Sequence, residues 1–285
     1  VQANGRPAVA YVDGDNEAIA FATRGADGTW TIGLVPIAGD AGDDIDLIQL
    51  EDGTFAIAYY ERIDDALRLV TGTPGAWTDI VVDDDGDGTS TIVGQDPTLL
   101  QLNDGRLAVV YQDSTNDQAR IAIRDENSTW TEARIDDGTD ASVRHSSVAQ
   151  ADDGTIYVAY TEDDDYEIRV ATSSNGTTWT SEAVWVEVYD TPYDPVLAIA
   201  PDGTVWVAFE QYIVGLVIAE KTEGGWTIHT DDASHNLAEL PSSGIADLVF
   251  DDAGYPMIVW EDDNEDGGVA VSRKTSSGWR IEDLV

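Results

Sequence analysis

Short runs of β-branched, aromatic and other apolar residues, each bounded by turn residues, follow one another along the chain. Residues 146–186 contain four of them, SSVAQ, TIYVAYTE, YEIRVATS and TTWTSEAVWV. Runs of this length and composition predict β-strands, and the Asp-Gly step between the first two supplies the positive φ of a tight hairpin. No stretch repeats apolar residues with the helical period. The pattern therefore predicts an all-β protein.

The four-run unit recurs six times. Six segments align, each opening on a marker glycine: Gly5, Gly53, Gly105, Gly154, Gly203 and Gly254. A tryptophan follows each glycine at a nearly constant distance: Trp30, Trp77, Trp130, Trp179, Trp226 and Trp279. Because two independent markers keep one period, we predict a single six-bladed β-propeller with four antiparallel strands per blade and each blade contiguous in sequence. The expected blades are 1–38, 39–90, 91–139, 140–189, 190–238 and 239–285.

The fourth and sixth residues after each marker glycine are large and apolar, as in Ile57 and Tyr59 of the second repeat. Both lie on one face of the predicted second strand, because side chains alternate between the faces of a strand. We interpret them as packing between neighbouring blades and not as a binding platform.

The charge narrows the expected partners. Acidic residues outnumber basic ones by 56 to 14, for a formal net charge of −42. Nucleic acid is not expected as a partner, since phosphate binding needs clustered Lys and Arg, and anionic membranes repel such a surface. Acidity of this degree is typical of proteins from saline environments, where salt screens self-repulsion, and equally of secreted calcium-loaded proteins.

Cysteine is absent, so neither disulfides nor thiol chemistry can contribute. The sequence has no apolar run of about 18 residues that would span a membrane, and no signal segment stands before the first repeat. We expect a monomer that is secreted or held at the cell surface, with any signal peptide removed.

The predicted second-to-third turns share one face with the links between blades, and nearly all are acidic. Examples are ERIDDA at 61–66, QDSTNDQ at 112–118 and TEDDDY at 161–166. One interpretation is a solvated edge whose like charges oppose aggregation between strands. The other is a negative face that binds cations or a basic partner.

One link between blades has the spacing of a calcium loop. Asp83, Asp85, Asp87 and Gly88 form D-x-D-x-D-G, which projects oxygens from alternate positions around a sharp turn, as Ca²⁺ requires. The match ends there, because Gly94 stands where a full EF-hand loop has Glu. A second candidate set with the same spacing is Asp262, Asn264 and Asp266.

A third candidate set occupies one repeated position, nine residues before the marker glycine, near the expected mouth of a central channel. Asp44, Asp96 and Asp194 are candidate metal ligands there, and His145 at the same position is a candidate ligand-binding residue. The alternative is that Asp before Pro, as in Asp96-Pro97, only fixes the entry turn.

Aromatic residues outside the repeated core positions gather around the fourth and fifth repeats. Trp185, Tyr189, Tyr193 and Tyr212 form this group. The three tyrosines are candidate ligand-binding residues because aromatic rings stack on sugars or peptide side chains, although such residues also cover interfaces between blades.

The repeat resembles the six-bladed extracellular propellers related to sialidases and BNR-repeat proteins. The segment TSSNGTTW, residues 172–179, is similar to the Asp-box turn of that group, with Ser174 in place of the Asp. The early arginine motif of the sialidases has only Arg6-Pro7 as a counterpart, which lacks the intervening apolar residue. The resemblance therefore implies a non-catalytic member.

Two functions remain at this stage. The first is an extracellular or cell-surface binding module whose acidic face engages a basic protein or a glycan, with Ca²⁺ as the candidate ion. The alternative is a glycan-processing or lactonase-like hydrolase with a metal at the channel mouth. The binding module is favoured, because the three histidines are scattered and no nucleophile elbow is present.

Overall fold

The structure, a computed structural model, describes residues 5–85, 91–136, 143–187, 192–211, 215–229, 242–262 and 268–283. The described residues form six antiparallel sheets and no helix, so within them no helix is long and apolar enough to cross a membrane. The chain divides into two compact units, Val1–Asp140 and Ala141–Val285.

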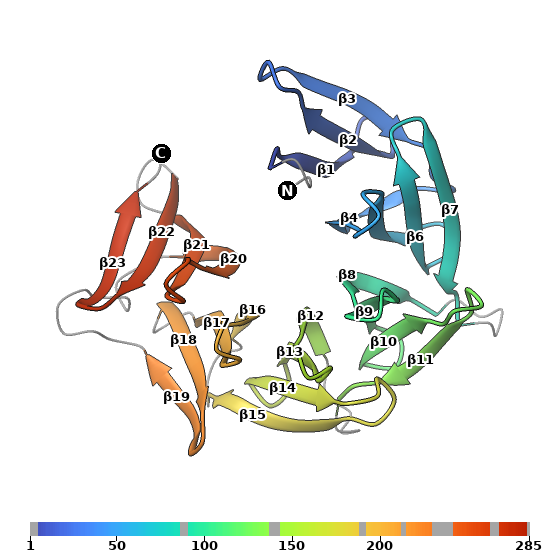
Figure 1. Ribbon diagram of the computed structural model, residues 1–285. Coiled ribbons are helices and arrows are strands. Elements are labelled where there is room, and N and C mark those ends of the chain that lie inside the picture. Colours follow the sequence, from blue (N-terminus) through green and yellow to red (C-terminus); the bar gives the residue numbers. More distant parts are fainter. Residues whose placement is uncertain are drawn as a thin grey trace. The chain divides into compact units, whose positions relative to one another are not determined.

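The first unit holds three sheets (Figure 1). The first sheet has β1 (Ala8–Asp13), β2 (Ala18–Arg24) and β3 (Trp30–Val35). The second has β4 (Ala41–Gln49), β5 (Phe55–Glu61), β6 (Ala66–Thr73) and β7 (Ala76–Asp83). The third has β8 (Val93–Gln101), β9 (Leu107–Asp113), β10 (Gln118–Arg124) and β11 (Trp130–Arg134).

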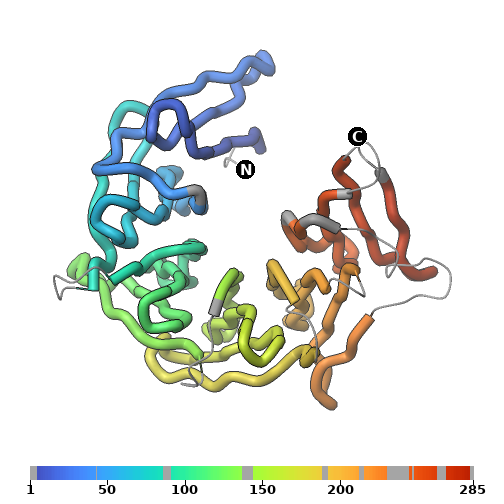
Figure 2. The backbone as a smooth tube through the Cα atoms, turned by 180° about the vertical axis from the view of Figure 1, so that it is seen from behind, coloured from blue at the N-terminus to red at the C-terminus, as the bar shows by residue number. Residues whose placement is uncertain are grey.

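The second unit holds three further sheets, which the chain visits in order (Figure 2). The fourth sheet has β12 (Val143–Gln150), β13 (Ile156–Glu162), β14 (Glu167–Ser173) and β15 (Thr180–Val186). The fifth has β16 (Tyr193–Ile199), β17 (Val205–Gln211), β18 (Gly215–Thr222) and β19 (Gly225–His229). The sixth has β20 (Ser242–Phe250), β21 (Pro256–Asp262), β22 (Gly268–Thr275) and β23 (Gly278–Asp283).

Every sheet consists of strands that are consecutive in sequence, and five of the six sheets have four strands among the described residues. The predicted all-β class and the contiguous four-stranded antiparallel unit are therefore confirmed. Closure as a six-bladed ring stays a prediction.

The core lies between neighbouring sheets of each unit, where the sequence predicts it. Ile57 and Tyr59 on β5 are fully buried and pack with Phe21 of the first sheet. In the first sheet itself, Val9 and Tyr11 are 43% and 41% exposed, because no sheet precedes theirs within the first unit. The repeated apolar positions of the second sheet thus pack against the first sheet.

A tyrosine and an arginine face each other across the middle strands of three sheets. Tyr59 lies directly opposite Arg68, whose Nε donates to the Tyr59 hydroxyl over 3.1 Å and lies 3.2 Å from Asp79 Oδ1. The same register pairs Tyr111 with Arg120 and Tyr160 with Arg169. Each guanidinium is largely buried, so the acidic groups around it are needed to balance its charge.

Candidate functional site

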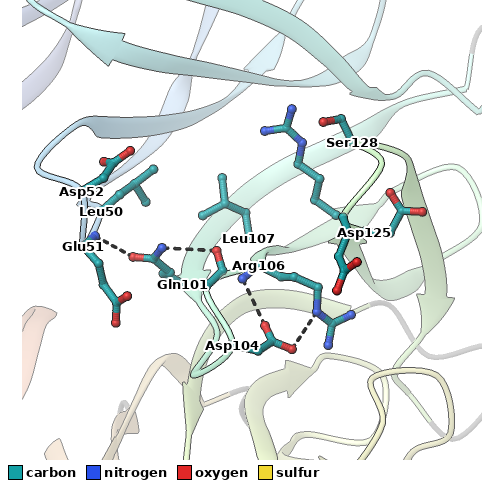
Figure 3. A pocket seen from close by; sticks show the side chains of 12 residues that line it. Leu50, Glu51, Asp52, Gln101, Asp104, Arg106, Leu107, Asp125 and Ser128 are labelled. Carbon is teal, nitrogen blue, oxygen red and sulfur yellow. Dashed lines mark hydrogen bonds and ion pairs between the residues drawn. The ribbon is translucent and has the colours of Figure 1, made fainter.

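A surface pocket of about 460 Å³ lies between the second and third sheets, entirely within the first unit. Three turns line it: the β4–β5 turn, the β8–β9 turn and the β10–β11 turn. Figure 3 shows Glu51 and Asp52 on one side of this pocket and Asp125 and Ser128 on the other. Its volume falls within the range of about 300 to 1,000 Å³ that is common for small-molecule sites. We name it the rim pocket.

Two of the three turns share one construction. The Asp52 carboxylate accepts a hydrogen bond from Thr54 N at 2.8 Å, and the Asp104 carboxylate accepts one from Arg106 N at 3.1 Å. The glycine between each pair has a φ of 85°, a conformation that other residues rarely adopt. The side chains around the rim pocket therefore stand on rigid turns.

Gln101 ties the two turns together. Its side-chain Nε2 donates to Gly105 O at 3.2 Å, and its Oε1 accepts a hydrogen bond from Glu51 N of the neighbouring sheet at 2.9 Å (Figure 3). These two bonds fix the spacing of the turns, so one side of the rim pocket is preorganised.

Arg106 and Asp104 form an ion pair at the mouth of the rim pocket. Arg106 Nε lies 2.8 Å from Asp104 Oδ2, and the two side chains are 40% and 54% exposed. Burial acts to raise the pKa of Asp104, but the hydrogen bonds and the charge of Arg106 outweigh it and lower that pKa below its usual value. Asp104 is therefore ionised well into the acidic range.

Arg124 is the second arginine of the rim pocket, at the end of β10. Its Nε is buried and has no hydrogen-bond partner among the described residues. Arg24 occupies the equivalent position at the end of β2, since each arginine pairs with the tryptophan that starts the next strand, and Arg24 Nε donates to Gly28 O at 3.3 Å. Arg124 lacks that local bond, and no other acceptor among the described residues replaces it.

Acceptors line the same pocket as these two arginines. Asp125 Oδ1 already accepts from Asn127 N and Thr129 N, and these bonds, led by the one from Thr129, lower the pKa of Asp125. Glu51, Glu126 and Ser128 also line the pocket and are exposed. Guanidinium donors beside carboxylate and hydroxyl oxygens suit a ligand that is rich in hydroxyl groups, because each hydroxyl can donate and accept.

The rim pocket was not predicted from the sequence, because short turns line it, whereas the candidate sites lay on the long acidic turns and links. A signal was present: Arg106 and Arg124 are two of only 14 Lys and Arg residues, and both lie at short turns of the third repeat. Two of these scarce positive charges therefore line one pocket.

The first predicted calcium loop is partly described. Asp83 is 5% exposed and accepts a hydrogen bond from the Tyr111 hydroxyl. Arg120 Nη1 lies 3.3 Å from Asp83 and 3.5 Å from Asp85, so this guanidinium is the cation that the structure places beside both carboxylates. Asp87 lies outside the described residues, and within them no group of three or more His, Asp or Glu residues is arranged to hold a metal ion.

Two further carboxylates face the same guanidinium. Arg120 lies 3.4 Å from Asp113 and 3.6 Å from Glu132. Burial and the charge of Asp83 raise the pKa of Glu132, although Arg120 acts in the opposite direction. One positive group therefore faces four negative ones.

The second calcium candidate cannot be located as a set. The backbone of Asp262 ends β21, whereas Asn264 and Asp266 lie outside the described residues. Calcium at either loop stays a prediction.

The repeated channel-mouth position lies in the first strand of each sheet, beside an irregularity in strand pairing. Asp96, His145 and Asp194 have φ values of 47°, 42° and 48°, and Asp44 lies within a similar register shift of β4. His145 Nδ1 is 3.6 Å from Asp194 Oδ1. The structure therefore brings together two of the predicted residues from neighbouring sheets of the second unit.

The predicted aromatic group is only partly described. Tyr193 starts β16 and is 39% exposed, whereas Tyr189 and Tyr212 lie outside the described residues. The Trp185 ring packs against Phe209 with centroids 5.9 Å apart, so Trp185 covers the junction between the fourth and fifth sheets.

The acidic second-to-third turns are not wholly solvated. Glu61, Asp113 and Glu162 are each 1% exposed. The Glu61 carboxylate accepts hydrogen bonds from the backbone N–H groups of Asp40, Ile63 and Asp64 at 2.9, 2.9 and 2.7 Å. The interpretation of these turns as a solvated edge is therefore wrong for Glu61, Asp113 and Glu162, and burial of the Glu61 carboxylate satisfies three backbone donors.

No family model and no curated protein matches the chain. Among solved structures, an ulvan lyase is similar with a TM-score of 0.72 at 10% identity, covering 100% of this chain and 82% of the lyase. A triple arginine mutant of AofleA from Arthrobotrys oligospora has a TM-score of 0.60 at 13% identity, covering 98% and 86%. A mutant Aleuria aurantia lectin has a TM-score of 0.57 at 18% identity, covering 98% and 92%.

Identities this low carry information on the fold alone. They do not test the finer resemblance to sialidase and BNR-repeat propellers. Together with the consecutive four-stranded sheets, these similarities give the chain a fold of the β-propeller type.

Proposed function

We propose that this protein is a carbohydrate-binding β-propeller and that the rim pocket is its saccharide site. The observation that carries the proposal is the buried Arg124 Nε, which has no partner among the described residues and lines a pocket rich in carboxylate oxygens. A buried donor without a partner costs free energy, so a ligand hydroxyl that accepts from it gains more than it would at an exposed surface.

Proteins with a similar fold support a carbohydrate ligand. The Aleuria aurantia lectin is described as fucose-specific and in complex with a fucosyl-N-acetylglucosamine, and the ulvan lyase is described as bound to a unit of glucuronic acid and sulfated rhamnose. These ligands belong to those proteins. For this chain they favour a glycan over the basic protein partner as the first ligand to test.

Other parts of the proposal rest on the sequence. We expect a secreted or cell-surface monomer, with a basic protein as a further partner of the acidic turns and Ca²⁺ at Asp83, Asp85 and Asp87. The net charge of −42 favours the basic partner and the calcium ion, because it attracts cations and basic surfaces.

Calorimetric titration with a panel of methyl glycosides tests the saccharide site. We expect at least one glycoside to bind, and Arg124→Ala to weaken its binding at least tenfold. Arg24→Ala is the matched control, because it removes the same charge at the equivalent strand position outside the pocket. Equal effects of the two substitutions would contradict the proposed site.

A second candidate function is glycan processing at His145 and Asp194. The observation that favours it is their 3.6 Å separation, with side chains 38% and 40% exposed, which puts a potential proton acceptor beside a carboxylate. Release of reducing or unsaturated ends from polysaccharides, lost in His145→Ala, would support this function, and its absence from the wild-type protein would leave binding alone.

A further inference from the structure

The rim pocket combines few positive groups with many negative ones. It is lined by Arg106 and Arg124 and by five carboxylates, those of Glu51, Asp52, Asp104, Asp125 and Glu126. Two positive and five negative groups give a formal charge of 2 − 5 = −3 for the lining. An anionic ligand would therefore enter a negative site on a molecule whose net charge is −42.

Two carboxylates of this lining, those of Asp52 and Asp125, have lowered pKa values. Hydrogen bonds from Thr54 lower the pKa of Asp52, and those from Thr129 and Asn127 lower the pKa of Asp125. These carboxylates are held by their own turns, so they cannot turn away when a ligand enters. A carboxylate or sulfate group on a ligand would therefore be repelled by fixed negative charges in the pocket.

The arginines do not reverse this balance. Arg106 is already paired with Asp104 over 2.8 Å (Figure 3). Arg124 has an available Nε, but the next two residues along the chain are Asp125 and Glu126. One available guanidinium beside two acidic neighbours favours a ligand that uses it as a hydrogen-bond donor without bringing a full negative charge.

A neutral sugar meets these requirements. Its hydroxyl groups can accept from Arg124 and donate to the free oxygens of Glu51 and Glu126, and it introduces no repulsion. We infer that the rim pocket selects an uncharged saccharide unit, bound by Arg124 through its hydroxyl groups, and discriminates against uronic acid and sulfated units. This inference rests on the proposed saccharide-binding function and specifies its ligand class.

Matched sugar pairs test the inference with the full chain. Methyl glucoside and methyl galactoside are each titrated beside the corresponding methyl uronide, and methyl fucoside beside its sulfated form, at 0.1 M and 1 M NaCl. We expect a neutral member to bind at least tenfold more tightly than its acidic partner at 0.1 M NaCl. Its own affinity should change less than about twofold with salt, because a neutral ligand is not subject to charge screening.

Substitutions at the arginine and at the glutamates test which groups cause the selectivity. Arg124→Ala should weaken the neutral sugar at least tenfold, while Arg24→Ala leaves it unchanged. The double substitution Glu51→Gln and Glu126→Gln should reduce the ratio of the affinities for neutral and acidic sugars. The reduction should be about threefold for each charge removed, as expected from the Coulomb interaction of partly solvated charges. Both glutamates are exposed and contribute no side-chain hydrogen bond to the turns, so the fold should be retained.

The outcomes separate the inference from the proposed function. If acidic sugars bind as tightly as neutral ones and Arg124→Ala still weakens binding, the inferred selectivity is overturned. The proposed saccharide binding is then retained. No binding of any sugar would overturn both. Neutral selectivity that the glutamate double variant does not change would also overturn the inference, because the discrimination would not come from the charge of the pocket.

Discussion

Asp46 Oδ2 accepts a hydrogen bond from Leu99 N at 2.7 Å, which joins the first strand of the second sheet to the first strand of the third. Ser147 makes the corresponding bond in the second unit, where its Oγ accepts from Leu197 N at 2.9 Å. The two residues occupy one position of the repeat, two residues after the channel-mouth position. This position therefore ties the first strands of neighbouring sheets to each other.

Asp46→Ala should destabilise the protein by about 1–3 kcal/mol, because Leu99 N is left without its charged acceptor in a buried strand. Urea denaturation followed by tryptophan fluorescence measures the loss. Ser147→Ala is the matched control, and its loss should be smaller, about 0.5–1.5 kcal/mol, since a neutral hydroxyl is the weaker acceptor. Equal losses of unfolding free energy in the two variants would show that the charge of the acceptor does not strengthen this hydrogen bond.

Glu61→Ala should cost about 3 kcal/mol or more, because three backbone N–H groups lose their acceptor. Gly39 is coupled to this carboxylate, since its φ is 71° and a Cβ there would overlap the Glu61 side chain. Gly39→Ala should therefore destabilise the wild-type protein more than it destabilises Glu61→Ala. Additive losses in thermal or urea unfolding of the double variant would refute this coupling.

Calcium at the Asp83 loop is tested by the shift in melting temperature between EDTA and millimolar CaCl₂. We expect Ca²⁺ to stabilise the protein, because among the described residues a single guanidinium, that of Arg120, is paired with the carboxylates of Asp83, Asp85, Asp113 and Glu132. Asp85→Asn should remove most of that shift, whereas Asp15→Asn, at an exposed turn, should retain it. A shift unaffected by Asp85→Asn would place the ion elsewhere.

The sequence predicted the elements whose cause is local. Strand positions follow from the alternation of side chains, and the burial of Tyr59 follows from its place in the repeat. The position shared by His145 and Asp194 was also visible as a repeat. Their contact across two sheets was not, because it depends on how the first strands pack.

The rim pocket and the Arg120 cluster could not be derived in this way. Arg120 meets Asp83 only because the end of β7 packs beside β10 of the next sheet, and the residues lie far apart in sequence. The lack of a partner for Arg124 Nε is likewise recognised only by comparison with Arg24. Arg24 occupies the same strand position in its own repeat and donates to a local acceptor, Gly28 O. Repeats predict shared geometry, whereas the differences between repeats require the structure.

Salt should raise the melting temperature by several degrees between 0.1 M and 1 M KCl. A net charge of −42 repels itself, and the Debye length falls from about 10 Å to about 3 Å over that range. NaCl should act equally, with EDTA present to exclude calcium. A melting temperature that is flat or falls would remove the argument for saline adaptation.

Alkaline pH should destabilise the protein through its buried tyrosines, and Tyr160 allows this to be measured. Burial raises the pKa of Tyr160 from 10.0 to about 12, although its hydrogen bond with Ser181 and the charge of Arg169 oppose the rise. The folded state thus keeps a proton that the unfolded chain loses above pH 10. Unfolded molecules then bind fewer protons than folded ones, so the free energy of unfolding falls as the pH rises from about 10 to about 12.

Tyr160→Phe lacks this proton and should lose less stability over the same range. The difference from the wild-type protein should approach about 2–3 kcal/mol near pH 12, from 1.36 kcal/mol for each unit between the two pKa values. Urea denaturation at pH 9 and pH 11.5 measures it. Tyr11→Phe, which removes the hydroxyl of a 41% exposed ring, is the control and should follow the wild-type protein. If Tyr160→Phe loses as much stability as the wild type, the hydroxyl ionises as easily in the folded state as in the unfolded chain.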